Sequence, residues 1–351
     1  MRKATKIGFI AVFCAAVGLT FPVFNIFSKQ LSMDSHENRL MTGLPQVLQS
    51  PLSQLPHSLD NFFVDNSPFR YQFVLLNAGI DYAVFGTSQS DQVLPGKDGW
   101  LFYKDGPTAA QPVANYQGLT DINDSPEAQA SAKLQILNDR LAENGCTLVL
   151  DLTPSKDRIY REYMPDGYPI VNEENRTDLL VGYLQSHTTV PVNWPYQELR
   201  RQARLNPDRL LYYKTDTHWN SIGALYGLDG IFDALGLPIL QPGDYPVEPA
   251  GTTTGDMANV AALYASLPPE QTYTVPGYAD LFAKDDRVVR VIGDSFSEYY
   301  MPYLEARFAT TWREHIDSFD PAVVEQPGCD ILILEFNERS LDKLLAILDS
   351  I

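Results

Sequence analysis

The chain has 351 residues, of which 44% are hydrophobic, and its formal net charge at pH 7 is −18. This length and hydrophobic content are sufficient for one large folded domain or two modest ones. The strongly acidic balance repels phosphate backbones, which argues against a nucleic-acid-binding protein. An anionic polymer would be repelled as well, unless a local basic groove offset the overall field.

Residues 1–30 are expected to form a membrane anchor. Arg2, Lys3 and Lys6 precede an uncharged stretch from Ile7 to Phe27, and about 20 apolar residues span the bilayer core as a helix. Because basic residues stay on the cytoplasmic side, the rest of the chain is expected outside the cytoplasm. A cleaved signal peptide is the alternative, but the absence of a small-x-small site after the stretch favours an uncleaved anchor.

Residues 31–80 are predicted to form a stalk and lead-in helices. The segment 28–57 is polar and punctuated by prolines, which favours an extended chain. From residue 58 to 85, apolar residues recur at helical spacing on either side of Pro68. Residues 81–351 are assigned to one folded domain.

A hairpin and a helix open this domain. Asp98-Gly99 lies between the apolar runs Val93-Leu94 and Leu101-Phe102-Tyr103, a pattern typical of a tight β-hairpin. Ser125-Pro126-Glu127 has the composition of a helix N-terminus, and this helix is expected to end at Asn144.

Three further runs predict buried strands. Cys146–Leu152 is mostly apolar and does not alternate, as strands buried on both faces do not, Arg287–Ile292 is another apolar strand, and Ile331–Phe336 is the last. The other expected elements are a helix over 177–185, a short strand over 190–192, a helix from Asn220 towards Gly236, a helix after Ser295 and a final helix. Residues 237–286 are rich in Pro, Gly and Thr and have no clear order. Strands alternating with helices predict a three-layer α/β domain with a mainly parallel sheet.

Cys146 and Cys329 each follow a glycine at the start of a predicted strand. Parallel strands that start in register would bring the thiols close, so a disulfide and a pair of buried thiols both stay open. The sequence has no C-x-x-C pair, and its five histidines do not cluster along the chain. No structural metal is therefore expected.

A serine follows the predicted strand at 287–292, in the sequence Gly293-Asp294-Ser295. Open α/β sheets bind ligands at the carboxyl ends of their strands, and helix amides beside this serine can stabilise an oxyanion. The alternative is that Ser295 only caps the following helix. The sequence differs from the G-x-S-x-G elbow of α/β-hydrolases.

The segment Asp216-Thr217-His218-Trp219-Asn220 contains a possible base for this serine. Imidazole has a suitable pKa near neutrality, and it needs a carboxylate to fix its tautomer. In an extended segment the side chains of Asp216 and His218 point to the same side. The alternative is a surface Asp beside a His that packs on Trp219. The other histidines lack a comparable setting: His36, His57, His187 and His315.

Beyond the first 30 residues, the chain resembles the AlgJ/AlgX-type alginate O-acetyltransferases of the SGNH hydrolase-like group. The order and spacing of six short motifs carry this resemblance: Glu37-Asn38-Arg39, Gly96–Phe102, Pro154-Ser155-Lys156 with Ile159-Tyr160, Thr215–Trp219, Gly293–Phe296 and Asn337-Glu338-Arg339. The resemblance implies an SGNH hydrolase-like fold and a triad of Ser295, His218 and Asp216. Asp and His precede the serine here, as in the permuted arrangement of this family. No carbohydrate-binding module is expected after Arg339, so the chain looks more like the AlgJ type.

The resemblance implies an extracytoplasmic O-acetyltransferase that moves acetyl groups onto hydroxyls of an exopolysaccharide through an acetyl-serine intermediate. Besides the amide of Ser295, the candidates for oxyanion or substrate contacts are Asp294, Asn220, Tyr299 and Arg339. Lys156, Tyr160 and Arg339 either support the fold or contact the substrate, and support is the favoured role of all three.

The expected location is the periplasm, with the N-terminal helix in the inner membrane. Acetyl-CoA is cytoplasmic, so the resemblance implies a membrane-bound O-acyltransferase partner that passes acetyl groups across. No cofactor is expected, since no phosphate-cradling glycine loop is visible.

Two other functions fit the sequence. A polysaccharide acetylesterase would use the same triad with water as the acceptor. A non-catalytic scaffold of a polysaccharide export complex is less compatible with an intact set of Ser, His and Asp. A metal hydrolase built on Asp216 and His218 would lack further ligands. Alginate and other exopolysaccharides are equally compatible acceptors.

Overall fold

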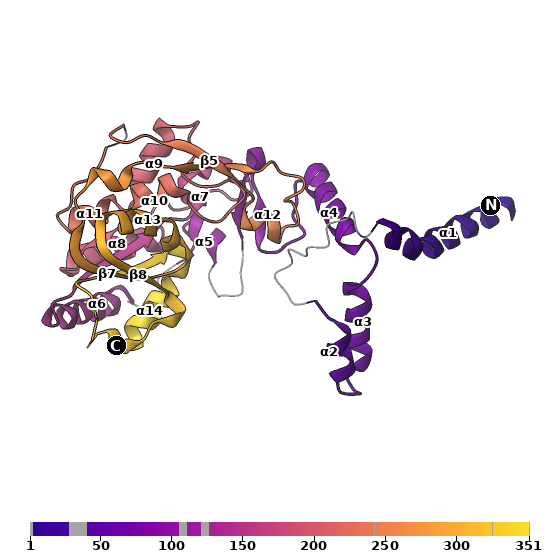
Figure 1. Ribbon diagram of the computed structural model, residues 1–351, viewed down its shortest axis with the longest axis horizontal. Coiled ribbons are helices and arrows are strands. Elements are labelled where there is room, and N and C mark those ends of the chain that lie inside the picture. The colour runs from indigo at the N-terminus through magenta and orange to yellow at the C-terminus, as the bar shows by residue number, and fades with distance from the viewer. Residues whose placement is uncertain are drawn as a thin grey trace. The chain divides into compact units, whose positions relative to one another are not determined.

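The computed structural model describes residues 3–27, 41–104, 111–120, 126–241, 243–324 and 326–350. The chain divides into two units, Met1–Gln89 with Asn259–Ser266 and Ser90–Ala258 with Leu267–Ile351 (Figure 1).

The first unit is helical. Its elements are α1 (Lys3–Phe27), α2 (Leu44–Gln49), α3 (Leu55–Asp65), α4 (Arg70–Ile80) and a π-helical turn (Asp81–Phe85). Within the described part of the chain, only α1 is long and apolar enough to cross a membrane, over Lys6–Phe24, a property that signal sequences share. The predicted break at Pro68 is confirmed, because it lies between α3 and α4.

The stalk or extended lead-in expected over 28–57 is helical in part, because α2 and the start of α3 lie within its described residues. Pro45 and Pro56 lie in the first turns of α2 and α3, where proline is accepted because its missing N–H has no partner in the helix. These prolines therefore begin helices instead of breaking them. Residues 28–40, with the motif Glu37-Asn38-Arg39, lie outside the described residues.

The second unit is built on a five-stranded sheet. Its strands are β3 (Thr147–Thr153), β4 (Val192–Asn193), β7 (Asp285–Gly293), β8 (Phe308–His315) and β9 (Ile331–Asn337). They follow the order β4-β3-β9-β7-β8, and every neighbouring pair is parallel. The predicted parallel sheet is confirmed, and β8 is an additional strand.

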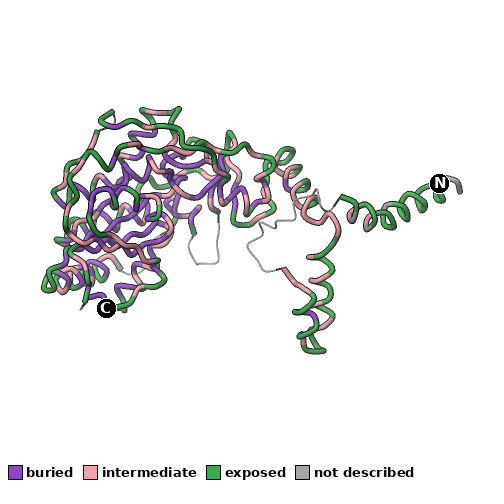
Figure 2. Tube along the Cα trace, in the orientation of Figure 1, coloured by how far each residue is buried: buried purple, intermediate pink, exposed green. Residues whose placement is uncertain are grey.

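Helices cover both faces of this sheet and make three layers. On one face, α6 (Pro126–Glu143), α8 (Arg176–His187) and α14 (Leu341–Ser350) pack against alternate residues of β3 and β9. On the other lie α9 (Tyr196–Leu205), α10 (Ser221–Gly227), α11 (Asp229–Ala234) and α13 (Met301–Arg307). Figure 2 shows buried residues gathered around the sheet. Burial on both faces explains why β3 and β9 are mostly apolar and do not alternate.

Shorter elements complete the fold. The predicted hairpin is confirmed as β1 (Val93–Pro95) and β2 (Leu101–Tyr103), and its turn holds Asp98 at φ 53° and Gly99 at φ 80°. A second antiparallel pair, β5 (Glu248–Thr253) and β6 (Glu270–Thr274), lies in the segment without predicted order. The remaining helices are α5 (Pro112–Tyr116), α7 (Lys156–Ile159) and α12 (Asp256–Val260).

Two helix predictions need correction. The helix expected from Asn220 towards Gly236 is divided at Leu228 into α10 and α11. The helix expected after Ser295 begins as a 3₁₀ turn, Ser295–Tyr299, and α13 starts only after Tyr300. The predicted cap Ser125 lies outside the described residues, and α6 begins at Pro126.

A buried carboxyl group lies in the central sheet. Asp151 on β3 is 0% exposed, and its Oδ1 accepts a hydrogen bond of 2.7 Å from Nδ2 of Asn193 on β4. Its Oδ2 has no hydrogen-bond partner. Burial, with a smaller effect of the charge of Asp294, raises the pKa of Asp151 to about 8 despite the hydrogen bond from Asn193.

Replacement of Asp151 by asparagine is expected to reduce the pH dependence of stability. In the unfolded chain an aspartate deprotonates near pH ~3.9, whereas the folded protein keeps this proton up to about pH 8. The unfolded state therefore binds fewer protons between these values, and the free energy of unfolding falls as pH rises, by up to about 1.4 kcal/mol per pH unit. Asp151→Asn removes this contribution, so the variant should gain stability relative to wild type from pH 5 to pH 8.

Urea unfolding followed by tryptophan fluorescence measures this effect, because all four tryptophans lie in the second unit. The exposed Asp139 gives a matched control variant, Asp139→Asn, whose pH dependence should equal that of wild type. Equal slopes for Asp151→Asn and wild type would contradict the prediction.

Candidate active site

Three strands of the sheet end at the same edge and deliver polar residues to it. The register pairs Thr153 with Asn337 and Gly293 with Glu335, so β3, β9 and β7 finish side by side. Ser155-Lys156 follows β3, Asp294-Ser295 follows β7, and Glu338-Arg339 follows β9. This edge collects three of the motifs that the sequence singled out.

The turn that carries Ser295 is held from several sides. A Cβ atom on Gly293 would lie 2.7 Å from Oε2 and 2.9 Å from Cβ of Glu335, so the close approach of β7 and β9 requires glycine here. Oδ1 of Asp294 accepts from the N–H of Phe296 and Oδ2 from the N–H of Asn337, each at 2.9 Å. Asp294 thus caps the helical turn and ties it to β9.

Ser297 and Arg313 complete this support. From β8, Nε of Arg313 donates to Oγ of Ser297 at 2.6 Å, and Nη2 donates to the carbonyl oxygen of Asp294 at 2.7 Å. The N–H of Ser295 makes no turn, cap or side-chain hydrogen bond among the described residues. This N–H therefore stays available to an anionic oxygen.

The structure brings Ser295, His218 and Asp216 together. Nε2 of His218 lies 2.7 Å from Oγ of Ser295, and Nδ1 lies 2.6 Å from Oδ1 of Asp216. Asp216 is only 9% exposed, and its Oδ1 also accepts from the backbone N–H of His218 at 3.0 Å. Such an arrangement can move the serine proton to the imidazole and stabilise the resulting imidazolium.

The charge state of Asp216 fits this arrangement. Burial raises the pKa of Asp216, but hydrogen bonds and charge from His218, together with the N–H of Asp256, hold it below its ordinary value. An ionised Asp216 accepts a hydrogen bond from the Nδ1–H group of His218, which leaves the lone pair of Nε2 facing Ser295.

Aromatic rings join the segment Tyr213–His218, the histidine segment, to the turn that carries Ser295. The ring of His218 stacks on Tyr299 with centroids 5.3 Å apart, and it lies 4.9 Å from the ring of Phe296. Nε1 of Trp219 donates to the carbonyl oxygen of Phe296 at 2.9 Å. The imidazole is thus fixed by packing as well as by hydrogen bonds.

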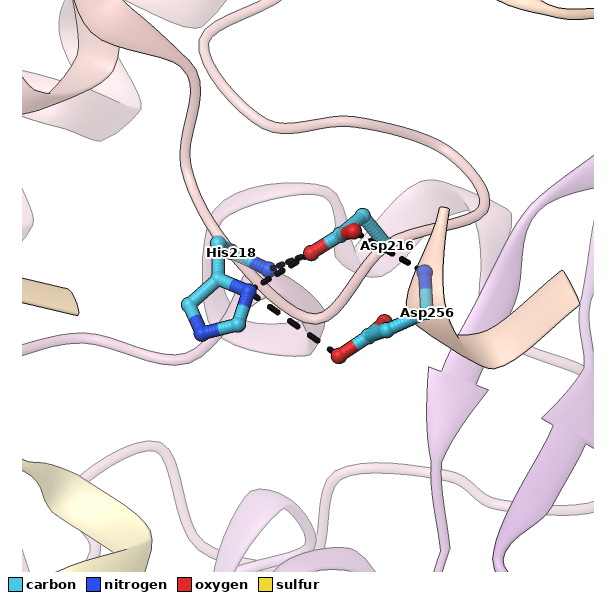
Figure 3. A group of neighbouring side chains, drawn as sticks. All are labelled: Asp216, His218 and Asp256. Carbon is cyan, nitrogen blue, oxygen red and sulfur yellow. Dashed lines mark hydrogen bonds and ion pairs between the residues drawn. The ribbon is translucent and has the colours of Figure 1, made fainter. Parts of the chain in front are cut away.

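Asp256, at the start of α12, supports the histidine segment (Figure 3). Its Oδ1 accepts from the N–H of Thr217 at 2.8 Å, and its Oδ2 accepts from the hydroxyl of Thr217. Its own N–H donates to Oδ2 of Asp216 at 2.9 Å. A Cβ atom on Gly255 would lie 2.1 Å from the backbone of Thr215, so α12 can approach this closely only through a glycine.

Asp216, His218 and Asp256 also have the composition of a metal site. Their ligand atoms lie within 4.8 Å of one another, so the expectation that Asp216 and His218 lack a further ligand is corrected. However, each carboxylate oxygen already accepts a hydrogen bond, and Nδ1 of His218 points at Asp216. A cation would have to displace these donors, so the residues fit a hydrogen-bonded carboxylate–imidazole pair better.

Two of the predicted contact residues are committed to the fold. Oδ1 of Asn220 caps α10 by accepting from the N–H groups of Ile222 and Gly223. Its Nδ2 donates to the carbonyl oxygen of Leu210, and the residue is 1% exposed. Both oxygens of Asp294 accept backbone N–H groups. Neither side chain is available to a substrate.

Tyr299 and Arg339, the other two predicted contact residues, are open to a ligand. The hydroxyl of Tyr299 has no hydrogen-bond partner among the described residues, and burial raises its pKa, so it stays protonated and can donate. The guanidinium of Arg339 lies over the rings of Tyr103 and Phe296, at 4.8 Å and 5.6 Å from their centroids. Within the described part of the chain it has no carboxylate at ion-pair distance.

Tyr160 supports the fold, as predicted. The hydroxyl of Tyr160 accepts from the N–H of Leu211 at 2.8 Å, ahead of the histidine segment. Glu338 was predicted only as part of a motif, without a role of its own. Its buried carboxylate accepts hydrogen bonds from the N–H of Ser155 at 2.7 Å and from the side-chain amides of Asn115 and Asn175. Asp256 and Glu270, which lie in the segment without predicted order, were missed.

A three-layer α/β domain with these contacts at the carboxyl edge of its sheet has the architecture of an SGNH hydrolase-like domain. Residues 93–311 match the sequence model of the family described as "SGNH hydrolase-like domain, acetyltransferase AlgX". This match spans more than half of the chain, so the protein belongs to this family.

Curated relatives have similar sequences. A "Probable alginate O-acetylase AlgJ" of Pseudomonas syringae pv. tomato is 26% identical over 328 residues, which cover 85% of this chain and 74% of that protein. The protein of the same name from Pseudomonas putida is 25% identical over 241 residues, 63% of this chain and 58% of that protein.

Solved structures are similar at lower identity. The O-acetyltransferase domain of Pseudomonas putida AlgJ has a TM-score of 0.48 and 19% identity, over 74% of this chain and 99% of that one. Bacillus cereus PatB1 with a sulfonyl adduct has a TM-score of 0.48 and 15% identity, over 72% and 98% of the two chains.

Proposed function

We propose that this protein is an O-acetyltransferase that moves acetyl groups onto hydroxyls of an exopolysaccharide, alginate or a similar polymer. The observation that carries the proposal is the continuous set of contacts from Ser295 Oγ to His218 Nε2 (2.7 Å) and from His218 Nδ1 to Asp216 Oδ1 (2.6 Å). Membership of an acetyltransferase family supplies the reaction class. The AlgJ relatives, named as alginate O-acetylases, supply the acceptor class.

The first half of the reaction forms an acetyl-enzyme. Nε2 of His218 takes the proton of Ser295 as its Oγ attacks the carbonyl carbon of the acetyl donor. The N–H of Ser295 and the hydroxyl of Tyr299 donate to the oxyanion. The tetrahedral intermediate then expels the donor's leaving group, which receives the proton from His218. Asp216 stabilises the imidazolium throughout.

In the second half, a sugar hydroxyl attacks the acetyl-serine while His218 accepts its proton. The Ser295 oxygen leaves and regains this proton, so the acetyl group ends on the sugar as an ester. Water in place of the sugar would give acetate, which is the acetylesterase reaction. The choice between transfer and hydrolysis therefore depends on the acceptor that occupies the site.

Arg339 is suited to hold an acidic acceptor. Its guanidinium lies against Phe296, next to the nucleophilic serine, and it is a cation in a chain of net charge −18. A guanidinium binds a carboxylate through paired hydrogen bonds. It can therefore dock the carboxylate of a uronic acid sugar and offset the repulsion of the surrounding acidic surface.

The same proposal places the domain in the periplasm, anchored by α1 in the inner membrane. The basic residues before the apolar helix support this orientation. Acetyl-CoA is cytoplasmic, so an extracytoplasmic site needs a membrane-bound O-acyltransferase that delivers acetyl groups to it.

The test uses the full-length protein in detergent with a chromogenic acetyl ester as donor. Oligomers of uronic acids and of neutral sugars are added as acceptors, and products are identified by mass spectrometry. Acetylated oligosaccharide supports the transferase, and a preference for uronate oligomers supports the role of Arg339. Acetate release with every acceptor would instead indicate the esterase. Absence of both turnover and labelling of Ser295 by a serine-directed phosphonate would indicate the scaffold.

A further inference from the structure

The ammonium group of Lys156 makes a three-way contact with the backbone of the histidine segment. Lys156 begins α7 directly after β3 and is 4% exposed. Its Nζ donates to the carbonyl oxygens of Tyr213 at 3.0 Å, Lys214 at 2.8 Å and Asp216 at 2.6 Å. These three hydrogen bonds use all three N–H groups of an ammonium.

Lys156 holds the carbonyl groups of this segment, and carboxylates hold its N–H groups. Glu270 accepts from the N–H groups of Lys214 and Thr215, and Asp256 accepts from the N–H of Thr217. The carbonyl groups are thus fixed by a cation and the N–H groups by anions. The segment ends at His218, so its position decides where the imidazole lies.

We infer that Lys156 is a positioning residue for the reaction: its ammonium group clamps the Tyr213–Asp216 backbone so that Asp216 and His218 align with Ser295. This inference rests on the proposed function of Ser295. It assigns to Lys156 a role in activity beyond support of the fold.

The surroundings of Lys156 make this clamp sensitive to pH. Burial lowers the pKa of Lys156 to about 7, against the opposing charges of Glu270, Asp216, Asp256 and Asp157. The rings of Trp100 and Phe102 lie 5.7 Å and 5.5 Å from Nζ, and Arg339 lines the same small cavity. A neutral amine has only two N–H groups, so deprotonation removes one of the three hydrogen bonds.

The test compares Lys156→Met and Lys156→Arg with wild type, all as full-length protein. Methionine keeps an apolar stem that ends at Cε and removes every donor, whereas arginine keeps donors and charge. The matched control is Lys133→Met, which removes a partly exposed lysine paired with Asp349. For each variant, kcat, KM and the pH profile of acetyl-ester turnover are measured, with the thermal unfolding midpoint as a check of folding.

Lys156→Met is expected to lower kcat about 10²-fold with little change in KM, because a small displacement of reacting groups has an effect of this size. Lys156→Arg is expected to restore most of kcat and to move the loss of activity above neutral pH to higher values, since arginine stays charged. Wild-type kcat in folded Lys156→Met would overturn the inference. A Lys156→Arg profile identical to that of wild type at alkaline pH would overturn the link to pH.

A separate readout does not depend on turnover. The NMR resonance of the Nδ1 proton of His218 reports its hydrogen bond to Asp216 in the absence of substrate. A shifted or broadened resonance in Lys156→Met supports the clamp even if wild type shows no Ser295-dependent turnover, in which case only the proposed function fails. An unchanged resonance overturns the clamp. If Lys156→Met does not fold, the same comparison is made with Lys156→Gln.

A different observation concerns the opposite edge of the sheet. Cys146 immediately precedes β3, and Cys329 lies two residues before the start of the neighbouring strand β9, whose Ile331 pairs with Thr147. Their Sγ atoms lie 3.7 Å apart, so rotation of the side chains within this space brings the atoms towards the bonded distance of about 2.05 Å. The expected proximity of the two thiols is confirmed.

We propose that Cys146 and Cys329 become joined by a disulfide when the folded chain meets a disulfide oxidant. Cys329 is the more exposed of the two, and the thiol of Cys146 and the charge of Arg290 lower its pKa, so it is the first to react. Its thiolate attacks the oxidant and displaces one thiol. The thiolate of Cys146 then attacks Sγ of Cys329 and displaces the second thiol. The protein loses two protons and two electrons, and the oxidant is reduced to two thiols.

The test incubates full-length protein with excess oxidised glutathione and maps its peptides without reduction. A linked Cys146–Cys329 peptide is expected in wild type and not in Cys146→Ser. Reduction should lower the thermal unfolding midpoint of wild type by roughly 4–7 °C and leave that of Cys146→Ser unchanged. Free thiols, or glutathione attached to Cys329 without a linked peptide, would overturn the proposal.

Discussion

Replacement of Ser295 by alanine is expected to reduce acetyl-ester turnover by roughly 10⁵-fold, the size of loss that follows removal of a nucleophile from a Ser-His-Asp set. Oγ of Ser295 is the hydroxyl that Nε2 of His218 contacts, at 2.7 Å. Ser297 cannot replace it, because its Oγ is engaged with Arg313 and with the carbonyl oxygen of Asp294. Initial rates with a chromogenic acetyl ester measure this loss of turnover, and labelling by a phosphonate shows whether Ser295 is the reactive group.

The fold should be insensitive to this substitution, so the thermal unfolding midpoint should match that of wild type. Ser186→Ala is a matched control that should keep full turnover, because Ser186 is exposed and its hydroxyl donates to the carbonyl oxygen of Gly182 in its own helix. Turnover above one tenth of the wild-type rate in Ser295→Ala would mean that another group is the nucleophile.

The core of the fold was predictable because its signals are local. The central strands β3 and β9 are buried on both faces, so each appears in the sequence as a mostly apolar run without alternation, interrupted only by Asp151 in β3 and Glu335 in β9 before the polar strand ends. The contacts among Ser295, His218 and Asp216 were predictable for a similar reason. A serine at a strand end and an Asp two residues before a His are short patterns, and the edge of a parallel sheet collects such residues.

Edge strands and supporting residues were harder to predict. Strand β8 lies at the edge of the sheet, and most of its residues are partly or fully exposed, so it lacks the apolar run of a central strand. Asp256 and Glu270 contact the histidine segment from about 40 and 55 residues further along the chain. Nothing local in the sequence connects these carboxylates to the N–H groups that they accept.

The role of Lys156 was predictable only in part. Its place in the motif Pro154-Ser155-Lys156 marked it as a residue of interest, but a lysine in a sequence is expected at the surface. Only the structure shows that it is buried against three carbonyl groups, because these belong to a segment nearly 60 residues away. Long-range contacts of this kind need coordinates.

Replacement of Asp216 by asparagine is expected to lower kcat about 10³- to 10⁴-fold. Oδ1 of Asp216 accepts from both Nδ1 and the backbone N–H of His218, and Oδ2 accepts from the N–H of Asp256. An asparagine amide can accept on one side only, so its NH₂ group faces a donor whichever way it is turned. If NH₂ faces His218, the imidazole proton moves to Nε2, which can no longer take the proton of Ser295. If NH₂ faces Asp256, the tautomer survives but the charge that stabilises the imidazolium is lost.

Asp256 cannot take over this role. Its Oδ2 lies 3.9 Å from Nδ1 of His218, beyond hydrogen-bond distance, and already accepts from the hydroxyl of Thr217. Asp256→Asn should therefore lower kcat far less than Asp216→Asn, because the backbone N–H of residue 256 still donates to Asp216 in this variant. Equal losses in the two variants would show that both carboxylates act on His218 as one unit. Because the pKa of Asp216 is held below its ordinary value, the loss in Asp216→Asn should persist across neutral pH, where wild-type Asp216 is fully ionised.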